Sequence, residues 1–449
     1  MSENIRTVKN VTCTFCGCVC DDMELTIDID ENRITKAKNA CTLGRAWYAE
    51  HGIQDLPAAM IDGKEVSVEA AIEESAQILT KAKFPIIYGL SSTTCEAQSQ
   101  AVAIADYMHG TIDSTSSVCH GPTGMAFQGV GESTMTLGEV KNRADLVIFW
   151  GCNPAVSHPR LFTRYAVTAT GMFMPKGKKD RTIVLVDVRK TESSPVANIN
   201  IRVKPGKDFE MLWALRALIK GKKIDPSIEE VTGVSLEALQ DLAERMKNCR
   251  YGVIFFGMGL TMARGRHFNI GALLSLATDL NEHTHFVVRS ARGHGNVSGG
   301  DQVITWSTGY PFGVNFNLGY PRFNPGEFTT VDTLCSGAAD AAMFIASDPA
   351  SNFPKAAIEH MKRIPVITLD AKHTMTSSLS HVAFTTSTYG INTGGTVYRM
   401  DDVPISLRKA YDSPFPSDEK ILTAIKNRVI ELTHAKRGAS DTREKRKVA

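Results

Sequence analysis

The sequence lacks any apolar run that approaches the ~18–20 residues of a membrane-spanning helix. The longest candidate, around Tyr251–Met262, is too short, and residues 1–10 lack the apolar core of a signal peptide. Net charge is low as well, because 50 basic residues oppose 48 acidic ones. A nucleic-acid-binding protein is usually more lopsided in charge. We therefore expect a cytoplasmic protein with no membrane span and no nucleic-acid partner.

The composition excludes a largely disordered chain, since 43% of the residues are hydrophobic and only 22% are charged. A length of 449 residues is enough for about two to four domains. The positive surplus lies at the C-terminal end, where residues 434–449 carry six Lys or Arg and two acidic residues. We expect a solvated basic tail there rather than a binding segment.

Cysteine is the residue whose distribution is unusual, because five of the ten cysteines lie within the first 41 residues. Disulfide frameworks belong to small secreted chains, so this cluster indicates metal or redox chemistry. Cys13, Cys16 and Cys20 form C-x2-C-x3-C, and Cys41 follows. This spacing is typical of four thiolates around one [4Fe–4S] cluster. Zinc and free thiols are the alternatives, but structural zinc sites usually come as two C-x2–4-C pairs. Cys18 is left out, since in an extended loop its side chain would point away from its neighbours.

Short apolar runs alternate with amphipathic stretches beyond about residue 69. We predict buried strands at 85–89, 146–150, 183–188, 253–256, 341–346 and 365–369. Helices are predicted at 68–83, 96–108, 208–219, 236–246 and 417–433. Strands that alternate with helices indicate βαβ units. The pattern therefore predicts an α/β fold with mostly parallel sheets that are covered on both faces.

One pattern occurs twice along the chain. Asn153-Pro-Ala follows the strand at 146–150, and Asp348-Pro-Ala follows the strand at 341–346. The next strand in each case ends in Asp-x-[Arg/Lys]-x-Thr, at Asp187–Thr191 and Asp370–Thr374. We call residues 146–191 the first repeat and residues 341–374 the second repeat. Ligands of open α/β sheets bind outside the carboxyl ends of the strands. The repeats predict two similar ligands, or one with two-fold character, with chance similarity of Pro-terminated loops as the alternative.

Taken in order, these motifs resemble the molybdopterin oxidoreductase family, which includes the bis-pterin formate dehydrogenases. Further matching segments are Lys204-Pro-Gly-Lys-Asp208, Gly257-Met-Gly259-Leu-Thr261, Arg292-Gly-His-Gly-Asn296-Val-Ser-Gly299 and Thr393-Gly-Gly-Thr396. The resemblance spans roughly residues 10–405. It implies a small N-terminal iron–sulfur domain and two related doubly wound α/β domains, which are domains I–III of the family.

The resemblance also gives expected domain boundaries. These are 1–55 for the [4Fe–4S] domain, 56–118 with 293–389 for the first pterin-dinucleotide domain, 119–292 for the second, 390–433 for a return segment with a C-terminal helix, and 434–449 for the tail. The family's usual C-terminal domain IV has no counterpart in this sequence.

Within the family, Cys119-His120-Gly-Pro-Thr-Gly124 and the short length resemble the B subunits of formylmethanofuran dehydrogenases. In those enzymes domain IV is a separate small subunit, so the resemblance implies such a partner. It also implies an amidohydrolase-like subunit that holds the methanofuran site, polyferredoxin-type iron–sulfur subunits and a heterodisulfide reductase complex.

The resemblance implies that Cys119 ligates tungsten or molybdenum beside the dithiolenes of two molybdopterin guanine dinucleotides. A soft thiolate suits such a metal, although an ordinary buried cysteine is the alternative. His120 would handle protons. Arg292 would hold the carboxylate of formate, or polarise CO2, through its planar guanidinium, and Arg289 competes for that role. The family's Lys between cluster and pterin is Leu43 here, and we expect Arg45 to replace it.

Each repeat would bind one guanine dinucleotide, because carboxylates accept hydrogen bonds from guanine or ribose while basic and N–H groups meet phosphate. The residues expected to bind cofactor are Asn153, Asp187, Arg189, Thr191, Lys204, Asp208, Gly257 and Gly259, and then Asp348, Asp370, Lys372 and Thr396. Loop capping is the alternative for each of them. Cys152 is expected beside a pterin nucleotide, and Asp113 and Thr115 are candidate pocket residues.

The implied reaction is the two-electron reduction of CO2 to formate, with electrons entering through the iron–sulfur cluster. A partner subunit would then condense formate with methanofuran. Another bis-pterin formate dehydrogenase is the nearest alternative. A non-redox formyltransferase/hydrolase subunit would lack the cluster and metal cysteines, and a non-catalytic electron-transfer scaffold would not need Cys119, His120 and Arg292. The sequence does not distinguish tungsten from molybdenum.

Overall fold

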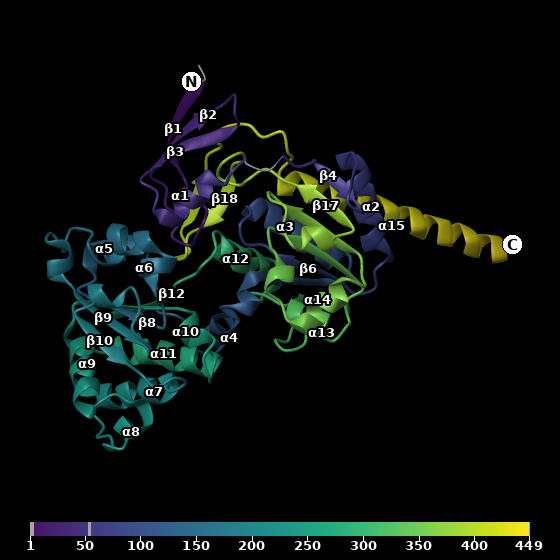
Figure 1. Ribbon diagram of the computed structural model, residues 1–449. Coiled ribbons are helices and arrows are strands. Elements are labelled where there is room, and N and C mark those ends of the chain that lie inside the picture. Colours follow the sequence, from purple (N-terminus) through teal and green to yellow (C-terminus); the bar gives the residue numbers. More distant parts are fainter. Residues whose placement is uncertain (1–3, 53–54, 449) are drawn as a thin grey trace.

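The computed structural model describes residues 4–52 and 55–448, with side chains through residue 435. These residues form two large β-sheets and two small ones. The large sheets lie side by side, and the small N-terminal sheet lies above the place where they meet (Figure 1). None of the helices in the described ranges is both long and apolar enough to cross a membrane.

The first large sheet is wholly parallel and has the strand order β10-β9-β8-β11-β12. Its strands are β8 (Leu146–Trp150), β9 (Thr182–Asp187), β10 (Ile199–Arg202), β11 (Tyr251–Phe256) and β12 (His285–Ser290). Ile148 and Trp150 pack with the helices on one face, whereas Val147 and Phe149 pack on the other. Burial on both faces explains why the strand is a continuous apolar run.

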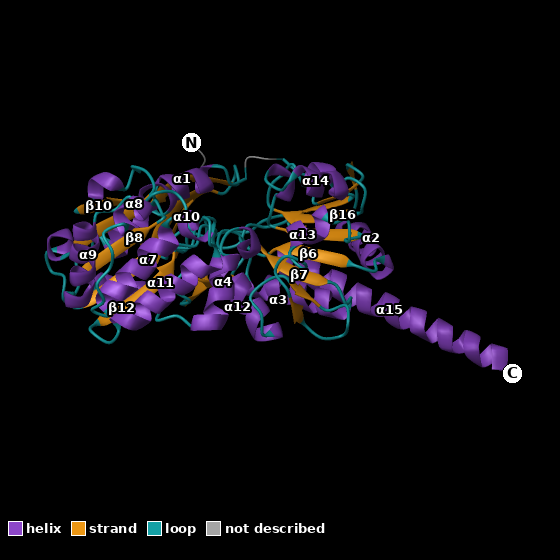
Figure 2. Cartoon of the chain, turned by 90° about the horizontal axis from the view of Figure 1, so that it is seen from below, coloured by secondary structure: helices purple, strands orange, loops and turns teal. Residues whose placement is uncertain are grey.

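Helices cover both faces of this sheet (Figure 2). One face packs against α7 (Asp208–Ile219), α9 (Leu236–Asn248) and α11 (His267–Leu280). The other packs against α5 (Leu137–Arg143) and the π-helical η2 (Leu161–Ala166), and its core continues into the N-terminal cysteine segment. The shorter elements are α4 (Gly121–Val130), α6 (Pro154–Ser157), η3 (Gly177–Asp180), η4 (Ser194–Val196), α8 (Ile228–Thr232) and α10 (Met258–Thr261).

The second large sheet has the order β14-β13-β7-β6-β15-β16-β17-β4-β5. Its five central strands are parallel, and the strands at both edges are antiparallel. They are β4 (Ala59–Ile61), β5 (Lys64–Glu65), β6 (Pro85–Gly89), β7 (Thr111–Ser114), β13 (Val314–Asn315), β14 (Arg322–Phe323), β15 (Ala341–Ile345), β16 (Val366–Asp370) and β17 (Val382–Thr385).

Two groups of helices sandwich this second sheet. The helices α2 (Val68–Lys81), α3 (Cys95–Tyr107), α12 (Val297–Thr308) and α15 (Asp418–Val448) pack on one face. The helices α13 (Thr330–Cys335) and α14 (Lys355–Met361) pack on the other. The remaining turns are η1 (Thr115–Val118), η5 (Pro349–Ser351) and η6 (Ser377–Leu379).

The N-terminal segment forms an antiparallel sheet of β1 (Ile5–Val11), β2 (Met23–Asp28) and β3 (Arg33–Lys38), followed by α1 (Thr42–Ala49). A hairpin of β18 (Gly395–Tyr398) and β19 (Pro404–Leu407) lies close to it (Figure 1). The cysteine loop is the long connection between β1 and β2.

The predicted α/β class with mostly parallel sheets is confirmed, and each predicted strand coincides with an observed one to within about two residues. The sheets draw their strands from residues 146–290 and from residues 59–114 with 314–385. The domain boundaries given above stay predictions. The C-terminal helix differs from the expectation, because α15 continues through the segment expected as a tail. That segment contains neither proline nor a glycine pair that would end a helix.

Candidate active site

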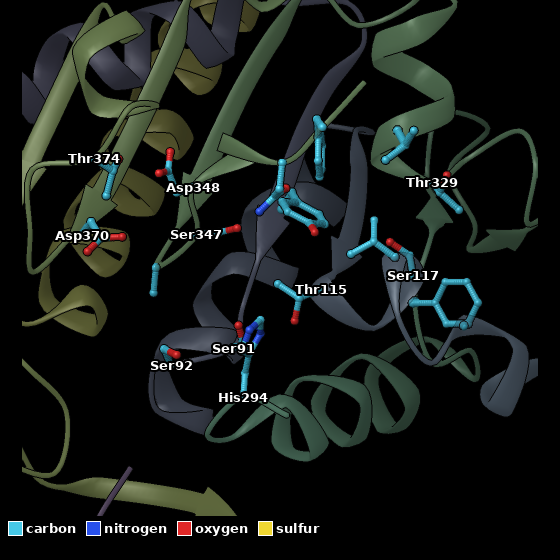
Figure 3. A pocket seen from close by; sticks show the side chains of 18 of the residues that line it. Ser91, Ser92, Thr115, Ser117, His294, Thr329, Ser347, Asp348, Asp370 and Thr374 are labelled. Atoms are coloured by element: carbon cyan, nitrogen blue, oxygen red, sulfur yellow. The ribbon is translucent and has the colours of Figure 1, made fainter. Parts of the chain in front are cut away.

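A cavity of about 1030 Å³ lies at the carboxyl ends of four parallel strands of the second sheet. Thr115 follows β7, Ser91 follows β6 and Asp348 follows β15, and all three line it (Figure 3). Lys372, which follows β16, lines it as well. Met262, Arg266 and His267 reach the cavity from the side of the first sheet. This edge is where open α/β sheets bind their ligands.

Cys119 lies beside this cavity, between η1 and α4. It is half-buried, and its neighbours Ser117, Val118 and Gly121 line the cavity. Its Sγ lies 3.3 Å from the carbonyl oxygen of Thr115. Burial raises the pKa of the Cys119 thiol to about 11, although nearby Arg292 opposes this rise. The thiol is therefore protonated at neutral pH and must lose its proton to bind a metal.

The residues after Cys119 explain the glycines of the C-H-G-P-T-G motif. A side chain at Gly121 or Gly124 would meet the ring of Phe312 at 3.2 and 3.1 Å. His120 is buried, with Nδ1 3.2 Å from Thr123 Oγ1 and its ring against Phe256. Burial, and then Arg292, lower the pKa of His120 well below its usual value. The imidazole is thus neutral, and its surroundings disfavour the protonated form.

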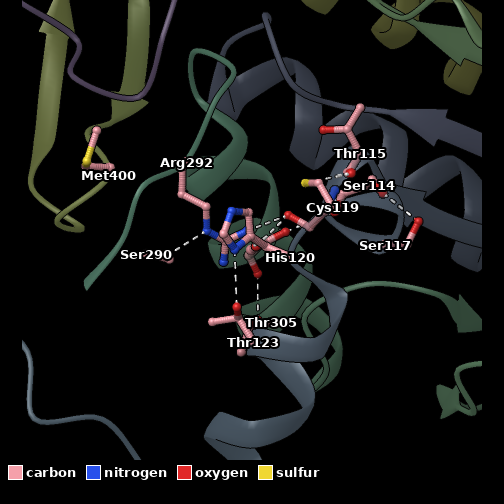
Figure 4. Close-up of polar contacts among 12 residues, drawn as sticks. Ser114, Thr115, Ser117, Cys119, His120, Thr123, Ser290, Arg292, Thr305 and Met400 are labelled. Carbon is pink, nitrogen blue, oxygen red and sulfur yellow. Dashed lines mark hydrogen bonds and ion pairs between the residues drawn. The ribbon is translucent and has the colours of Figure 1, made fainter. Parts of the chain in front are cut away.

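Arg292 belongs to a buried polar network that joins three elements (Figure 4). Its Nη1 donates to Ser116 Oγ at 2.8 Å and forms an ion pair with Asp301 Oδ2 at 2.9 Å. Ser114 and Ser116 also donate to the Asp301 carboxylate, at 2.9 and 2.8 Å. Burial is the chief reason why the pKa of Asp301 is raised. Within the described residues, Nη2 of Arg292 has no hydrogen-bond partner. Arg292 therefore keeps N–H groups available for a ligand.

Arg289, the competing arginine, is held elsewhere. Its Nη1 lies 3.0 Å from Glu132 and from Thr134 Oγ1, and its Nη2 lies 2.6 Å from Asp402. Its Nε donates to the carbonyl oxygen of Met400. All three nitrogens are therefore occupied, so the geometry favours Arg292 over Arg289 as the ligand-facing arginine.

The other residues of the R-G-x-x-N motif hold backbone segments in place. Asn296 has φ of 55° and holds three segments, since it donates to Thr93 O and accepts from Tyr398 N–H. A side chain at Gly295 would lie 1.8 Å from Thr14 O, so only glycine allows the motif to contact the cysteine loop. His294 is exposed to the cavity (Figure 3), and desolvation by the surrounding protein lowers its pKa.

The five N-terminal cysteines line one small enclosed cavity together with Arg160. Cys41 caps α1, and a side chain at Gly44 would meet Cys13 Sγ at 3.2 Å and Cys41 Sγ at 3.9 Å. Among the described side chains, no group of three or more His, Cys, Asp or Glu is spaced to hold a metal ion. The five cysteines nevertheless line one cavity, and Gly44 has no side chain to fill it, so these residues fit an iron–sulfur cluster.

Cys18 differs from the expectation, because it lines the same cavity as the other four. The loop is not extended there: Val19 has φ of 39°, and its N–H donates to Cys16 O at 3.0 Å. Cys16 and Cys18 share a hydrogen bond, which is the main reason why the pKa of Cys16 is lowered to about 6. Burial raises the pKa of Cys20 to about 12 and raises that of Cys13 as well.

Arg45 does not lie between the two cavities. It is exposed and lines neither of them. Trp47 occupies that place, with its ring 6.2 Å from Phe15 of the cysteine loop, and it lines the large cavity. The Nζ of Lys372 lies 5.3 Å from the Trp47 ring. The expected role of Arg45 was therefore assigned to the wrong face of α1.

The two repeats are held by matching hydrogen bonds. Asn153 Oδ1 accepts from Ser193 Oγ at 2.7 Å, and Asp348 Oδ1 accepts from Thr376 Oγ1 at 2.6 Å. Each hydroxyl in turn accepts from the N–H of Ala155 or Ala350. The two Asp-x-[Arg/Lys] steps also match, since Asp187 and Asp370 each accept from the N–H two residues later. The repeat is structural and not a chance similarity of loops.

The candidate nucleotide residues divide unequally between the repeats. From the second repeat, Asp348, Asp370, Lys372 and Thr374 line the large cavity, whereas none of the candidates from the first repeat does. Asp418 of α15 joins the second group. One of its carboxylate oxygens is bonded to Thr93 Oγ1, and the other is buried with no hydrogen-bond partner among the described residues. Burial, and then Asp418 and Asp348, raise the pKa of Asp370 to about 7, against a lowering by the Lys372 N–H.

Several candidates have structural partners instead. Lys204 Nζ donates to Glu230 O, and Asp208 accepts from Trp150 Nε1, which leaves its second oxygen buried and unpaired. Thr396 lies on β18, where its N–H donates to Glu96, and it does not line the cavity. Gly257 and Gly259 let their loop pack closely on Gly151 and Cys152. The Sγ of Cys152 contacts the carbonyl oxygen of Phe255. Thr191 Oγ1 is buried with no partner among the described residues, and Arg189 is exposed.

Asp113 is a structural residue, because its carboxylate accepts from Ser114, Gly313, Ser117 and Thr330. Sequence reasoning missed Asp301, His294, Trp47 and Asp418. Only His294 carried a signal, since it lies inside the R-G-x-x-N motif. The others become visible only when distant segments meet.

Comparisons with known proteins agree with this architecture. No protein-family model matches the sequence. The formyltransferase/hydrolase complex of Methylorubrum extorquens contains a chain with a TM-score of 0.69 and 23% identity, covering 84% of this chain and 99% of that one. Acetylene hydratase from Pelobacter acetylenicus has a TM-score of 0.72 at 12% identity, covering 94% and 69%. The fold is thus shared with both of these proteins.

Sequence similarity is more specific than the fold. The chain is 43% identical over 437 residues to the B subunit of the tungsten-containing formylmethanofuran dehydrogenase 2 of Methanocaldococcus jannaschii, covering 95% of this chain and all of that protein. The corresponding protein of Methanococcus maripaludis is 42% identical over the same length. The chain belongs to the family of formylmethanofuran dehydrogenase B subunits and is part of an oxidoreductase.

Proposed function

We propose that the chain is the redox subunit of a formylmethanofuran dehydrogenase and reduces CO2 to formate. The reaction consumes CO2, two electrons and one proton and yields formate. The proposed centre is a tungsten or molybdenum ion with two molybdopterin guanine dinucleotides, and Cys119 is its protein ligand. The observation that carries the proposal is the polar network through Ser116 and Asp301, which joins the Cys119 segment to Arg292 beside the large cavity.

The residues around the cavity support distinct steps. Nη2 of Arg292 has no hydrogen-bond partner among the described residues, so its N–H groups are proposed to donate to a carboxylate ligand. Asp301 compensates its charge and limits how far the guanidinium can move. His120 is the proposed proton-handling residue because it lies next to Cys119, and its imidazole is neutral in this site. When bound, the metal–pterin centre would accept or donate the electron pair.

Electrons would enter through one [4Fe–4S] cluster in the cysteine cavity. Cys13, Cys16, Cys20 and Cys41 are its proposed ligands, and Cys18 is a neighbour in the same cavity. The cysteine loop also contacts the Arg292 segment, because a side chain at Gly17 would lie 2.4 Å from Arg292 O. This close approach places the cysteine loop next to the segment that carries Arg292, which supports electron entry from this side.

The second repeat is the better-supported nucleotide site, since its carboxylates line the cavity. Asp348, Asp370 and Lys372 are the proposed contacts to guanine, ribose or phosphate. The first repeat is proposed to bind the second dinucleotide with Asn153, Asp187 and Arg189, on a surface that a small partner subunit would cover. An amidohydrolase-like subunit would use the formate, and polyferredoxin-type subunits, with a heterodisulfide reductase complex, would supply electrons. The M. extorquens relative is part of a complex with methylofuran, which supports a multisubunit assembly.

The test is metal analysis with a formate:viologen assay on the anaerobically purified complex. Cys119→Ser is expected to lower the activity at least about a hundredfold, since even residues behind metal ligands contribute 10–100-fold. Cys249→Ser is the matched control, because Cys249 is also half-buried but lies away from the cavity. It should keep wild-type activity.

Two results would contradict the proposal. Normal activity of Cys119→Ser would remove Cys119 from the site. A wild-type complex with iron but neither tungsten nor molybdenum would fit an electron-transfer scaffold, and one without iron as well would fit the non-redox formyltransferase/hydrolase type.

A further inference from the structure

One buried imidazole lies outside the residues assigned above. His158 follows α6 in the first repeat and is only 1% exposed. Its Nε2 lies 2.6 Å from the carbonyl oxygen of Arg292, and its Nδ1 lies 2.8 Å from Ser157 Oγ. A carbonyl oxygen can only accept, so Nε2 carries a hydrogen, whereas Nδ1 pairs with a serine hydroxyl whose Oγ also lies 3.1 Å from Asn153 O. Both ring nitrogens are satisfied, and the ring orientation is fixed.

The second repeat shows that this loop does not need a histidine. Aligning Asn153 with Asp348 pairs His158 with Phe353. The two residues make the same backbone bond, from His158 N–H to Pro154 O at 2.9 Å and from Phe353 N–H to Pro349 O at 2.8 Å. Phe353 packs its ring against Tyr88, 5.3 Å away. An apolar ring is therefore sufficient for the loop, and the imidazole in the first repeat has another role.

The carbonyl group that His158 binds lies at a junction. On its other side is Gly17 of the cysteine loop, where a side chain would come within 2.4 Å of the oxygen. The residues next to His158 also reach this loop, since Pro159 and Arg160 line the cysteine cavity. Arg292 O is thus held between the cysteine loop and the imidazole. The side chain of the same residue extends into the Ser116–Asp301 network (Figure 4).

We propose that His158 is a positioning residue for Arg292: its Nε2–H fixes the Arg292 backbone against the cysteine loop, so that the guanidinium stays aligned for a carboxylate ligand. The bond acts on backbone position, so it affects where the guanidinium lies and not its charge. A displacement of about 1 Å in such a group can cost up to about a hundredfold in rate. This inference rests on the proposed function of Arg292, but the contact can be measured without it.

The experiment compares His158→Phe, His158→Leu, His158→Gln and Ser157→Ala in the complete complex. Phenylalanine is the residue of the second repeat, and leucine is a smaller apolar replacement. Glutamine can place an N–H donor near the position of Nε2. Ser157→Ala removes the other bond of the imidazole and leaves the bond to Arg292. The readouts are KM and kcat for formate, the iron and tungsten content, and hydrogen exchange of the amides in residues 291–296.

The apolar variants are expected to keep their metal content, to raise KM for formate about tenfold with a smaller loss of kcat, and to exchange faster at 291–296. His158→Gln and Ser157→Ala should stay within about threefold of the wild type in KM. An unchanged KM and unchanged exchange in both apolar variants would overturn the proposal. So would failure of both to assemble, or equal losses in His158→Gln, because either result assigns His158 to folding alone. If the wild-type complex does not oxidise formate, the proposed function fails, whereas the exchange of residues 291–296 still reports on the His158 contact.

Discussion

The loop after β8 and the loop after β15 are held by matching hydrogen bonds, but they differ in what their outward-facing residues contact. Asn153 and Asp348 accept from the hydroxyl groups of Ser193 and Thr376 in the same way. In the first repeat the loop packs against other protein segments, including the Arg292 carbonyl. In the second repeat it faces the large cavity. The shared bonds therefore form a common scaffold, and the outward positions carry the difference in role.

The first residue after each strand shows the same division. Gly151 and Ala346 both have positive φ values, 56° and 47°. A side chain at Gly151 would lie 2.8 Å from Leu260 N and 2.9 Å from Gly259 C, whereas Ala346 lines the cavity. The first repeat thus needs glycine for both conformation and space. The second needs only the conformation, and it places an alanine there at some cost.

The largest effect is expected from Gly151→Ala. The left-handed conformation costs an alanine about 1–2 kcal/mol, and the contact with backbone atoms of residues 259–260 adds a similar amount. We expect the free energy of unfolding to fall by about 3 kcal/mol, measured by chemical denaturation. A loss below about 1 kcal/mol would mean that the 257–259 loop moves away without difficulty, and the contrast between the repeats would then disappear.

The acidic end of the cavity gives the next effect. The pKa of Asp370 is raised to about 7, so the folded state holds a proton there below that pH, while the unfolded chain loses it near pH 4. The folded state binds more protons in this window, so this contribution to stability falls as the pH rises from about 4 to 7. Raising the pH from 5 to 7 should destabilise the cofactor-free wild type by about 2 kcal/mol relative to Asp370→Asn.

Thermal unfolding at several pH values measures this difference. Asp113, whose pKa burial raises to about 6, acts in the same direction in both proteins and cancels. Asp418 interacts with Asp370, so its contribution belongs to the measured difference. Asp187→Asn is the matched variant in the first repeat, because Asp187 accepts the equivalent backbone bond. This variant measures how much the loss of that backbone hydrogen bond alone changes the stability. Parallel curves for wild type and Asp370→Asn would contradict the prediction.

A smaller effect is expected from exchanging the two cap residues. Asp348→Asn keeps an oxygen for Thr376, as Asn153 does for Ser193, so the fold should survive. It removes one negative charge from the cavity wall. Loss of one charged hydrogen bond of about 1.4 kcal/mol should speed release of pterin dinucleotide from the purified complex about tenfold. Asn153→Asp is the reciprocal change at the proposed site of the second dinucleotide, and it should not speed release, because an aspartate there can still accept the hydrogen bonds that Asn153 accepts. Equal effects of the two changes would break the comparison.

The sequence was sufficient for the strands of both repeats, because fully buried parallel strands are apolar runs with polar residues at their ends. The N-terminal strands β1–β3 were not predicted, since β1 is largely exposed and shows no apolar alternation. The ordered spacing of motifs also led to the choice of Cys119 and Arg292, whose segments do meet around Ser116. Their roles stay predictions.

The contacts that the sequence did not predict are made between distant segments. Ser116 and Arg292 are 176 residues apart, and His158 and Arg292 are 134 residues apart. No local pattern reports that Asp301 lies between them. The position of Cys18 was misjudged for a local reason, because nothing in the residue types of the cysteine loop announces a positive φ at Val19. Arg45 was assigned to the wrong face of α1, since spacing from Cys41 alone does not give the direction in which that helix runs.

The smallest effect is expected from Ala346→Gly, the reverse of the first substitution. Glycine relieves the left-handed strain of about 1–2 kcal/mol, but its greater freedom in the unfolded chain costs about 0.5–1 kcal/mol. Ala346 lines the cavity and is only partly buried against the core of the second sheet, so few contacts are lost and we expect a gain of at most about 1 kcal/mol in the free energy of unfolding. Chemical denaturation beside Gly151→Ala gives the measurement. A clear destabilisation by Ala346→Gly would show that the alanine methyl group makes important packing contacts. The first residue after the strand would then be tightly packed in both repeats.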